Sequence, residues 1–423
     1  MDAYSLRSLA GSRHDQKRLG IAYKLALLLY VFTVVLFSYR EGLTVFAKMA
    51  GLILAGFFLL RTVMQGERIF LPIEYKLLFA WFVVGVISSS LAKDPAATVA
   101  RLLTLAQVFP LAFITSNILV WNGDSRFYWL TIVAAALLSG VITVTGGNEF
   151  VGLDGRLFGT LGNANAFASL LAAGVAICLA VAVMERRSVL IRAMAVLSAA
   201  FFLYLVGRTG SRMGMLACMV AGFAVAACSQ FGRKGRVLPR LVGILVVGSV
   251  LVGGSLYYFS GAEFADRLAA LTMAATGGNF SNVGDSSLSN RALLFRRALE
   301  MGLDNPLLGV GVDVFRTASI DLSQIGNNSH SNYVEIFAST GLVGVIAYFS
   351  MYYFWWVKLV RAKGLLSDPY LRTRYATAVA IAALLLVLDV ASVTYYGKLI
   401  WIVLAGLIAE ASMLSRAAKI VRG

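Results

Sequence analysis

The sequence predicts an all-α polytopic membrane protein with about twelve spanning helices and one long loop that carries short helices. Three observations lead to this fold class. Apolar residues make up 59% of the 423-residue chain and its mean hydropathy is +0.80, whereas soluble domains hold roughly 45–50% apolar residues. Apolar windows close to the roughly 20 residues that a spanning helix needs recur along the chain. Lys and Arg residues separate many of these windows.

The expected spanning helices follow the apolar windows in order. These windows lie at about 21–39, 42–60, 74–92, 98–120, 127–145, 164–184, 189–207, 212–230, 239–259, 331–357, 375–392 and 395–414. The expected organisation is residues 1–259 with nine spans and a cytoplasmic N-terminus, a long outer loop at 260–330, and residues 331–423 with three spans and a cytoplasmic C-terminus.

The distribution of basic residues predicts the orientation. With the N-terminus inside, the inner segments hold about two thirds of the 37 Lys and Arg residues, and short basic loops stay in the cytoplasm. The formal charge of +16 is therefore interpreted as a signal for topology and for anionic membrane lipids, not for nucleic acid. The three cysteines lie within apolar runs, which favours simple packing and provides no disulfide framework.

The long outer loop is expected to be functional, since loops beyond about 15 residues in compact proteins are usually functional or disordered. It opens with an amphipathic stretch near Phe264 and continues through a Gly/Ser/Asn-rich segment from Gly277 to Ser289. A short helix is predicted from about Asn290 to Met301, ended by Gly302 and the Asp304-Asn305-Pro306 turn.

Two outer segments combine small polar residues with arginines. The first precedes the sixth span and contains Arg156, Gly159, Gly162, Asn163 and Asn165. Glycines let a backbone approach a ligand, but asparagine at a helix start also caps the helix, so ligand binding and a capped re-entry turn both stay open.

The second segment lies at the junction of the seventh and eighth spans and holds Arg208, Ser211 and Arg212. Arg212 opens a helix, and N-terminal amides together with a guanidinium make an anion site. The alternative is that these arginines merely reach for the membrane surface.

Helical periodicity places Arg291 on the inward face of the predicted loop helix. Within about 60° of it lie Leu294, Phe295, Ala298 and Gly302. The other side carries Arg296, Arg297 and Glu300. An inward guanidinium needs an anionic partner, which is either a carboxylate of the protein or a bound phosphate.

His330 is one of only two histidines and lies where the long loop enters the tenth span. A place in the first helical turn favours the neutral imidazole because the helix dipole opposes positive charge there, and a neutral ring can accept a proton from a hydroxyl. A purely structural histidine is the alternative. Glu335 lies about 140° round the helix, so no dyad within this helix is expected. Asp389, near the outer end of the eleventh span, is either functional or paired with an arginine.

The outer arginines suggest a diphosphate donor that is already activated and linked to lipid. The sequence contains no clustered metal-ligand spacing, Walker loop or dinucleotide fingerprint. Lys and Arg stabilise the charge on a departing phosphate without a metal, so no cofactor is expected. The chemistry indicated is glycosyl transfer from a polyprenyl diphosphate.

Four motifs follow one another on the same predicted face. They are Arg156-x-x-Gly159 with Asn165, Ser211-Arg212, Arg291 followed by Asp304-x-Pro306-x-x-Gly309-x-Gly311, and His330-Ser331-Asn332 followed by Gly341-x-x-Gly344. In order and spacing they resemble the O-antigen ligase/polymerase superfamily, over roughly residues 150–345.

The resemblance implies a GT-C-type, inverting, metal-independent glycosyltransferase at the periplasmic face of the bacterial inner membrane. In its ligase branch, an O-antigen chain passes from undecaprenyl diphosphate to the lipid A-core oligosaccharide. Arg212 and Arg291 would then bind the diphosphate, with Arg156 and Arg208 in support, and His330 would orient or deprotonate the acceptor hydroxyl. The rest of the expected substrate-binding set is Asn163, Asn165, Ser211, Asn332 and Asp389.

Two other functions stay open. The O-antigen repeat-unit polymerase shares these motifs and often carries an arginine, ten residues and then a glycine in two outer loops. Arg291 and Gly302 have this spacing, but phenylalanines follow Arg156 and Arg212 at the corresponding positions. A transporter or flippase for the same lipid predicts charged or broken-helix sites near the bilayer midplane and often internal repeats, and no repeat is visible.

Overall fold

The computed structural model describes residues 20–92, 95–152, 155–185, 188–230, 286–320 and 327–422. Within these ranges the ordered elements are all helices, joined by turns and by one isolated antiparallel bridge between Val151 and Leu157. The predicted all-α class is therefore confirmed.

Ten helices in the described ranges are long and apolar enough to cross a membrane. They are α3 (Thr44–Gln65), α4 (Ile73–Ser90), α5 (Pro95–Asn122), α6 (Arg126–Thr145), α7 (Ala164–Met184), α8 (Val189–Thr209), α9 (Arg212–Gln230), α15 (Asn332–Ala362), α16 (Pro369–Ala391) and α17 (Lys398–Arg422). Helix α2 (Ile21–Phe37) is also apolar but has only 17 residues. These helices follow the predicted windows, except that the window at 239–259 lies outside the described residues, as does the stretch near Phe264.

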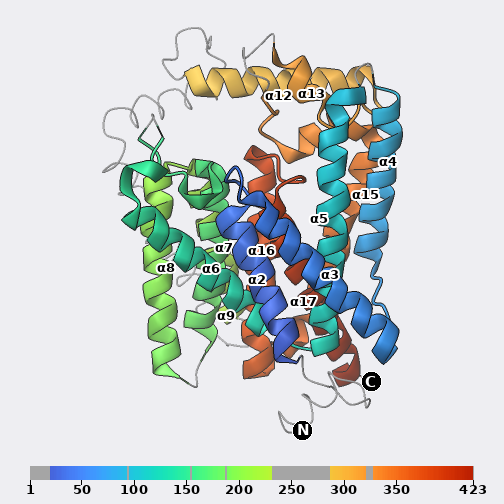
Figure 1. The fold of residues 1–423 in the computed structure, drawn as a ribbon. Coiled ribbons are helices and arrows are strands. Elements are labelled where there is room, and N and C mark those ends of the chain that lie inside the picture. The colour runs from blue at the N-terminus through green and yellow to red at the C-terminus, as the bar shows by residue number, and fades with distance from the viewer. Residues whose placement is uncertain are drawn as a thin grey trace.

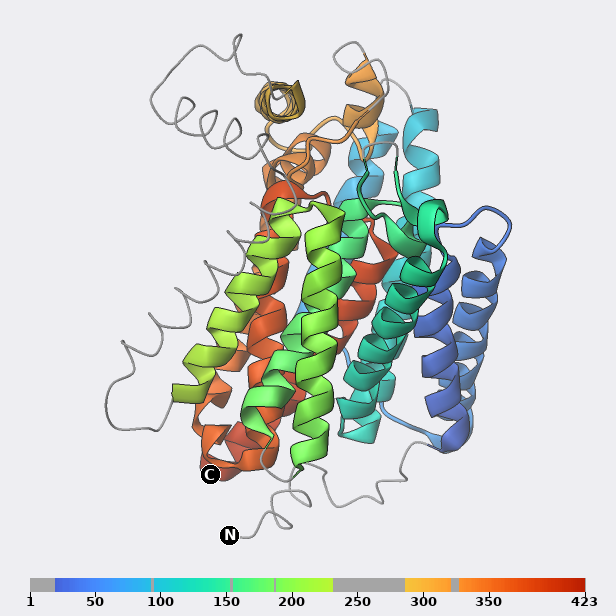
Figure 2. The same cartoon turned by 90° about the vertical axis from the view of Figure 1, so that its left-hand side faces the viewer.

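The long helices run side by side between two ends of the molecule (Figure 1). Helix α2 begins and α17 ends at the lower end of this view, whereas α12 (Ser286–Asp304) and α13 (Val314–Ala318) lie at the upper end. Figure 2 shows α12 end-on above the ends of the long helices, so α12 lies across them. We call this the α12 end. The predicted domain bounds, with a long loop at 260–330 opposite both termini, stay a prediction, since residues 1–19, 231–285 and 321–326 lie outside the described ranges.

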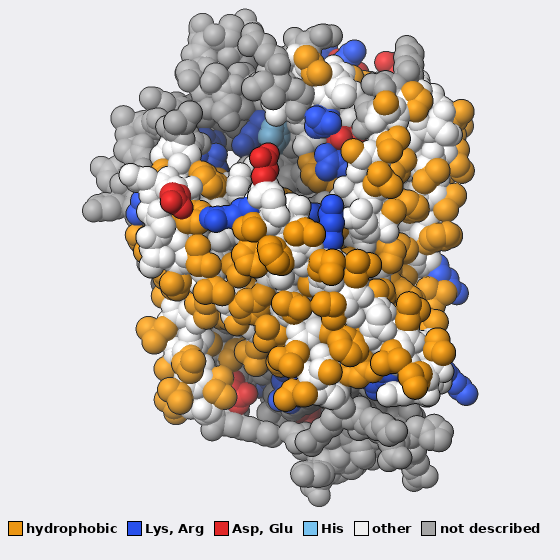
Figure 3. Space-filling model, in the orientation of Figure 1, with side chains coloured by type: hydrophobic (Ala, Val, Ile, Leu, Met, Phe, Trp, Pro, Cys, Tyr) orange, Lys and Arg blue, Asp and Glu red, His pale blue; other side chains and the backbone are white. Residues whose placement is uncertain are grey.

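Apolar side chains cover the middle of the molecule, and charged side chains gather towards its two ends (Figure 3). Helices α7 and α17 are the most buried of the ten candidate spans, and α3 and α8 are the least buried. A belt of exposed apolar side chains between two charged ends is the distribution expected of a multi-pass membrane protein.

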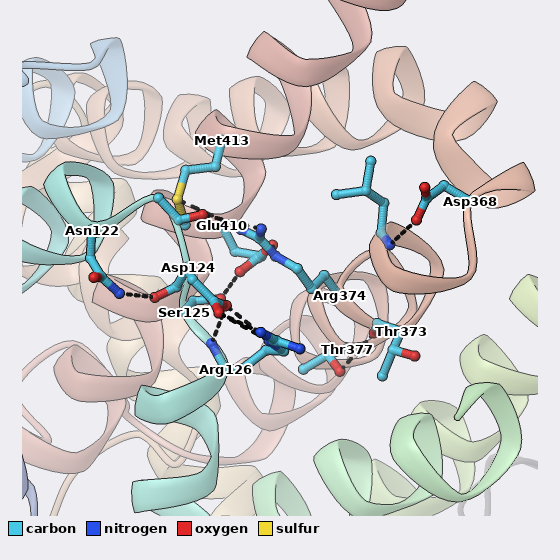
Figure 4. Close-up of polar contacts among 12 residues, drawn as sticks. Asn122, Asp124, Ser125, Arg126, Asp368, Thr373, Arg374, Thr377, Glu410 and Met413 are labelled. Atoms are coloured by element: carbon cyan, nitrogen blue, oxygen red, sulfur yellow. Dashed lines mark hydrogen bonds and ion pairs between the residues drawn. The ribbon is translucent and has the colours of Figure 1, made fainter. Parts of the chain in front are cut away.

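A buried ion pair joins α16 and α17 (Figure 4), the second of which ends at the lower end of the view in Figure 1. Arg374 of α16 donates from Nε to Glu410 of α17 at 2.6 Å, and the side chains are 4% and 0% exposed. The Ser125 hydroxyl donates to the second oxygen of Glu410, and Arg374 also donates to the carbonyl of Gly123 at 3.3 Å. The pair therefore links α16 and α17 to the start of α6.

Helix α15 is interrupted at Gly341, where the backbone adopts φ 62° and ψ −164°. The segment that precedes α13 crosses the interruption. The N–H groups of Val310 and Gly311 donate to the carbonyls of Ala338 and Ser339, at 2.8 and 3.0 Å. In the reverse direction, the N–H of Leu342 donates to the carbonyl of Pro306 at 2.8 Å.

This crossing explains the two glycine motifs in physical terms. A Cβ on Gly341 would lie 2.3 Å from the backbone of Leu307, and a Cβ on Gly309 would lie 2.5 Å from the carbonyl of Ala338. Both residues also have positive φ. Glycine is thus required on both sides of a contact in which the crossing segment satisfies backbone groups that the broken helix leaves unpaired. The contact fixes the end of the long loop against α15.

Candidate functional site

The predicted site residues lie on the elements at and below the α12 end, and Figure 3 shows a hollow there, lined by basic, acidic and histidine side chains. The contributing elements are the loop at 155–163, the junction of α8 and α9, helix α12, and the turn that leads into α15. These elements are far apart in the sequence, and the helical bundle brings their ends to the same side.

Arg156 ties the loop before α7 to the end of α8. Its Nε donates to the carbonyl of Thr209 at 2.7 Å, and its Nη2 donates to the side chain of Asn165 at 3.3 Å. The N–H of Leu157 donates to the carbonyl of Arg208 at 3.2 Å, so backbone contacts reinforce the same junction. The first two predicted segments therefore form one unit, with Arg156 half-buried between them.

Asn163 caps α7, as the capped-turn alternative predicted. Its side-chain oxygen accepts from the N–H groups of Asn165 and Ala166, at 2.9 and 3.1 Å. Ser211 acts similarly at the start of α9, where its hydroxyl accepts from the N–H of Gly214 at 3.2 Å. Asn163 and Ser211 thus have a structural role, because each side chain caps the start of a helix.

Two arginines flank the start of α9 in different environments. Arg208 is exposed and donates to the hydroxyl of Tyr204 at 3.2 Å, one turn earlier on α8. Arg212 is the first residue of α9, as predicted, and is half-buried. Of the two, Arg212 therefore combines a guanidinium with helix N-terminal amides.

The inward face predicted for Arg291 is largely confirmed. Leu294 and Ala298 are buried, and Gly302 packs so closely on Phe337 of α15 that an added Cβ would lie 2.4 Å from that ring. Arg291 itself is half-buried. The opposite face is exposed: Arg296 pairs there with Glu300 at 2.9 Å, and its side chain is 79% exposed.

Two details of this prediction are wrong. Phe295 is 43% exposed, because the face buried against α15 is narrower than the apolar face of the helix. The helix also runs from Ser286 to Asp304, beyond the predicted bounds. Gly302 lies inside α12 and serves close helix packing, not helix termination.

His330 lies just before α15 and not in its first turn, since Ser331 is the N-cap residue and the helix begins at Asn332. Its backbone is left-handed, with φ 59°. Burial lowers the pKa of His330 to about 4, and the positive charge of Arg291 acts in the same direction. The neutral imidazole is favoured as predicted, but by burial and a neighbouring guanidinium, where the sequence suggested a helix dipole.

Asn332 and Asp389 belong to one buried network between α15 and α16. The side-chain oxygen of Asn332 accepts from the N–H groups of Thr394 and Tyr395, at 3.1 and 3.2 Å. Asp389 accepts from the hydroxyls of Tyr352 and Thr394. The hydrogen bonds to Asp389 therefore come from hydroxyls, whereas the alternative interpretation of the sequence expected an arginine partner. The network anchors the loop after α16 beneath the turn that carries His330.

A further charged cluster was not predicted. Arg101 of α5 pairs with Asp313 at 3.1 Å, and Arg316 pairs with the other oxygen of Asp313 at 3.1 Å. The guanidinium of Arg101 also lies 3.7 Å from the ring centroid of Tyr396. The available signal was an arginine inside the apolar window at 98–120, which is rare enough in membrane spans to mark a specific role.

The fold and the site together define a multi-pass helical membrane protein with a cluster of arginines and one histidine at one end. Residues 195–349 match the family model described as O-antigen ligase, so the chain contains an O-antigen ligase family domain. The match runs from within α8 to within α15 and includes Arg208, Arg212, Arg291 and His330. Proteins of this family are membrane enzymes of the O-antigen ligase/polymerase type. No curated protein matches the chain.

Proposed function

We propose that this protein is an O-antigen ligase that transfers O-antigen polysaccharide from undecaprenyl diphosphate to the lipid A-core oligosaccharide. The observation that carries the proposal is that Arg291 and His330, both half-buried, lie on elements at the α12 end inside the matched family domain, where burial and the charge of Arg291 lower the pKa of His330. A neutral imidazole accepts a proton, and a guanidinium beside it binds a diphosphate.

The reaction is a single inverting displacement. The acceptor hydroxyl oxygen forms a bond to the anomeric carbon while the bond from that carbon to the diphosphate oxygen breaks, and undecaprenyl diphosphate leaves with the electron pair. The hydroxyl proton passes to His330. Arg291 and Arg212 stabilise the negative charge that develops on the leaving diphosphate, which is the role that fixed cations fill in such transfers. No metal or nucleotide takes part in this scheme.

The remaining predicted residues contribute to the site less directly than Arg212, Arg291 and His330. Arg156 and Asn165 hold the loop against the α8–α9 junction, with Arg208 at its exposed edge. Asn163 and Ser211 shape the two helix starts beside them. Asn332 and Asp389 act from below by fixing the loop after α16. We therefore propose that this second group acts on the substrate mainly by ordering the elements that contact it.

The α12 end is proposed to face the periplasm of the bacterial inner membrane. Two single cysteines test this orientation, Arg296→Cys on α12 and Gly364→Cys between α15 and α16, since both positions are exposed and the native cysteines are buried. A membrane-impermeant thiol reagent applied to spheroplasts should label only the first. Labelling of only the second would reverse the orientation.

The repeat-unit polymerase stays the nearest alternative, because the family domain covers both activities. A transporter is less well supported. It predicts a broken helix at the substrate site, and α15 is indeed broken, but the chain's own segment from Pro306 to Gly311 occupies the break through backbone hydrogen bonds.

The deciding experiment is transfer in proteoliposomes loaded with an undecaprenyl-diphosphate-linked glycan, in excess chelator and without nucleotide. One sample receives lipid A-core as acceptor and another a second lipid-linked repeat unit, each with His330→Ala as control. Glycosylated lipid A-core that disappears in the variant supports the ligase. Elongated lipid-linked glycan would instead identify a polymerase, and an absolute requirement for metal or nucleotide would refute the mechanism.

A further inference from the structure

The turn that carries His330 is held by its own serines. The N–H of Ser331 donates to the hydroxyl of Ser329 at 3.3 Å, and that hydroxyl donates to the carbonyl of Ser331 at 2.9 Å. Both serines are buried, and His330 between them has left-handed backbone, which is uncommon for a residue with a side chain. Such a conformation persists only where the surroundings impose it.

Glu335 supplies a contact that imposes it. Its Oε2 accepts from the N–H of Ser329 at 2.8 Å, so a side chain in the first turn of α15 reaches back to the residue before His330. Glu335 is fully buried, and among the described residues its other oxygen, Oε1, has no hydrogen-bond partner. Burying a carboxyl group with an unsatisfied oxygen is unfavourable, and glutamate at this position is therefore not explained by packing.

The same turn is tied down on its other side. The side-chain amide of Asn328 donates to the hydroxyl of Tyr396, whose ring lies against Arg101. Asn332 holds the backbone of the loop to which Tyr396 belongs. With Asn328 and Asn332 fixing the flanks, the contact from Glu335 acts on the backbone N–H of Ser329, the residue before His330.

We propose that Glu335 is a positioning residue, which holds the Ser329-His330-Ser331 turn and so fixes the direction of the His330 side chain. The inference rests on the proposed function, because it assumes that transfer depends on where His330 points. Glu335 acts as a hydrogen-bond acceptor towards a backbone N–H, and its negative charge is not needed for that task.

Two substitutions separate acceptor from charge. Glu335→Gln keeps a side-chain oxygen for the Ser329 N–H but removes the charge, and we expect transfer to stay within about threefold of the wild type. Glu335→Met keeps the volume without an acceptor, leaves the buried N–H unpaired, and should lower transfer roughly tenfold or more. The matched control is Glu300→Gln on α12, where the carboxylate is exposed and should be dispensable.

A second readout does not depend on transfer. The chain has only two histidines, so His330 is the sole histidine in a His14→Ala background. Diethyl pyrocarbonate modifies neutral imidazoles, and mass spectrometry reports the rate at His330. In Glu335→Met the turn loses one buried hydrogen bond, so we expect the modification rate at His330 to rise severalfold. Glu335→Gln keeps that hydrogen bond and should leave the rate unchanged.

The two readouts distinguish the failures. If wild-type protein transfers no glycan but the modification rates follow the expected order, the proposed function fails and the positioning role stands. Folding of each variant is checked by size-exclusion chromatography, with Glu335→Ala as the second acceptor-free variant if Glu335→Met does not assemble. The proposal would be overturned if a folded Glu335→Gln variant lost transfer or showed a raised modification rate at His330. It would also be overturned if a folded acceptor-free variant showed the wild-type modification rate at His330.

Discussion

Arg291 on α12 and His330 at the entry to α15 are coupled electrostatically, although they belong to different elements of the long loop and the following span. The guanidinium charge adds to the effect of burial, and together they lower the pKa of His330 to about 4. The residue that would bind a departing diphosphate thus also keeps the histidine unprotonated. Under the proposed mechanism, the base and the anion site would therefore be ready for proton abstraction before any substrate arrives.

The pH dependence of transfer should follow this lowered pKa. His330 would be neutral above about pH 4. An ordinary histidine has a pKa of 6.5 and becomes protonated as the pH falls from about 7 to about 6. Transfer by the wild type should therefore stay near its maximum from about pH 8 down to about pH 5 and fall on further acidification. Initial rates in proteoliposomes with both faces buffered would measure this. An acid limb centred near 6.5 would mean that His330 is not the proton acceptor or is not buried.

Arg291 and Arg296 are a matched pair for testing the face of α12. Arg291→Ala removes the half-buried guanidinium beside His330, and transfer should drop by roughly a hundredfold or more, the usual effect of losing one charge-stabilising donor. Arg296 points away and pairs with Glu300 on the surface, so Arg296→Ala should keep activity within about twofold. The comparison uses turnover per folded molecule in the transfer assay, and equal losses would refute the assignment of faces.

The positions of the helices and the face of α12 that carries Arg291 were predictable, because the sequence signals for them are local. Apolar windows mark the spans, and helical periodicity alone places Arg291 on the same side as Leu294 and Ala298. Asn163 shows where a local signal stays ambiguous: the same residue type at a helix start caps the helix or contacts a ligand, and only the structure shows the cap.

Contacts between distant segments were not predictable in the same way. Nothing in the local sequence around Asp313 indicates that it pairs with Arg101, which belongs to another helix. The interruption of α15 at Gly341 is hidden as well, since a glycine in an apolar window equally suits close packing of an unbroken helix. The neutral state of His330 was anticipated, but its cause depends on burial and on Arg291, which a sequence alone does not place beside it.

The buried pair of Arg374 and Glu410 should be a major source of stability between α16 and α17 (Figure 4). Arg374→Met leaves the Glu410 carboxylate buried without its guanidinium, and removing one partner of such a pair costs about 3–5 kcal/mol. The nearby pair of Arg126 and Asp124 is a natural control, because the Arg126 side chain is 53% exposed and Arg126→Ala should cost less than about 1 kcal/mol. Thermal unfolding in detergent should rank the two variants in this order. Similar melting temperatures would show that the buried pair contributes no more than a surface contact.

The crossing at Gly341 predicts a sharp difference between two otherwise identical substitutions. Gly341→Ala places a Cβ 2.3 Å from the backbone of Leu307, at a position where φ is 62°. The atoms that the Cβ would meet belong to the backbone, so no side-chain rotation can relieve the clash. The variant must therefore separate the crossing segment from α15 and leave backbone groups such as the Leu342 N–H unpaired within the bundle, where each unsatisfied group is costly.

The control is Gly56→Ala in α3, where nothing lies within 4 Å of the added Cβ. Alanine is the better helix former by about 1 kcal/mol, so this variant should fold at least as well as the wild type. Monodisperse yield and melting temperature would measure both effects. We expect Gly341→Ala to lose most of its folded yield and, in any folded fraction, to expose the His330 turn to diethyl pyrocarbonate, because the crossing fixes the long loop against α15. Normal folding with an unchanged His330 rate would mean that the crossing does not position the turn.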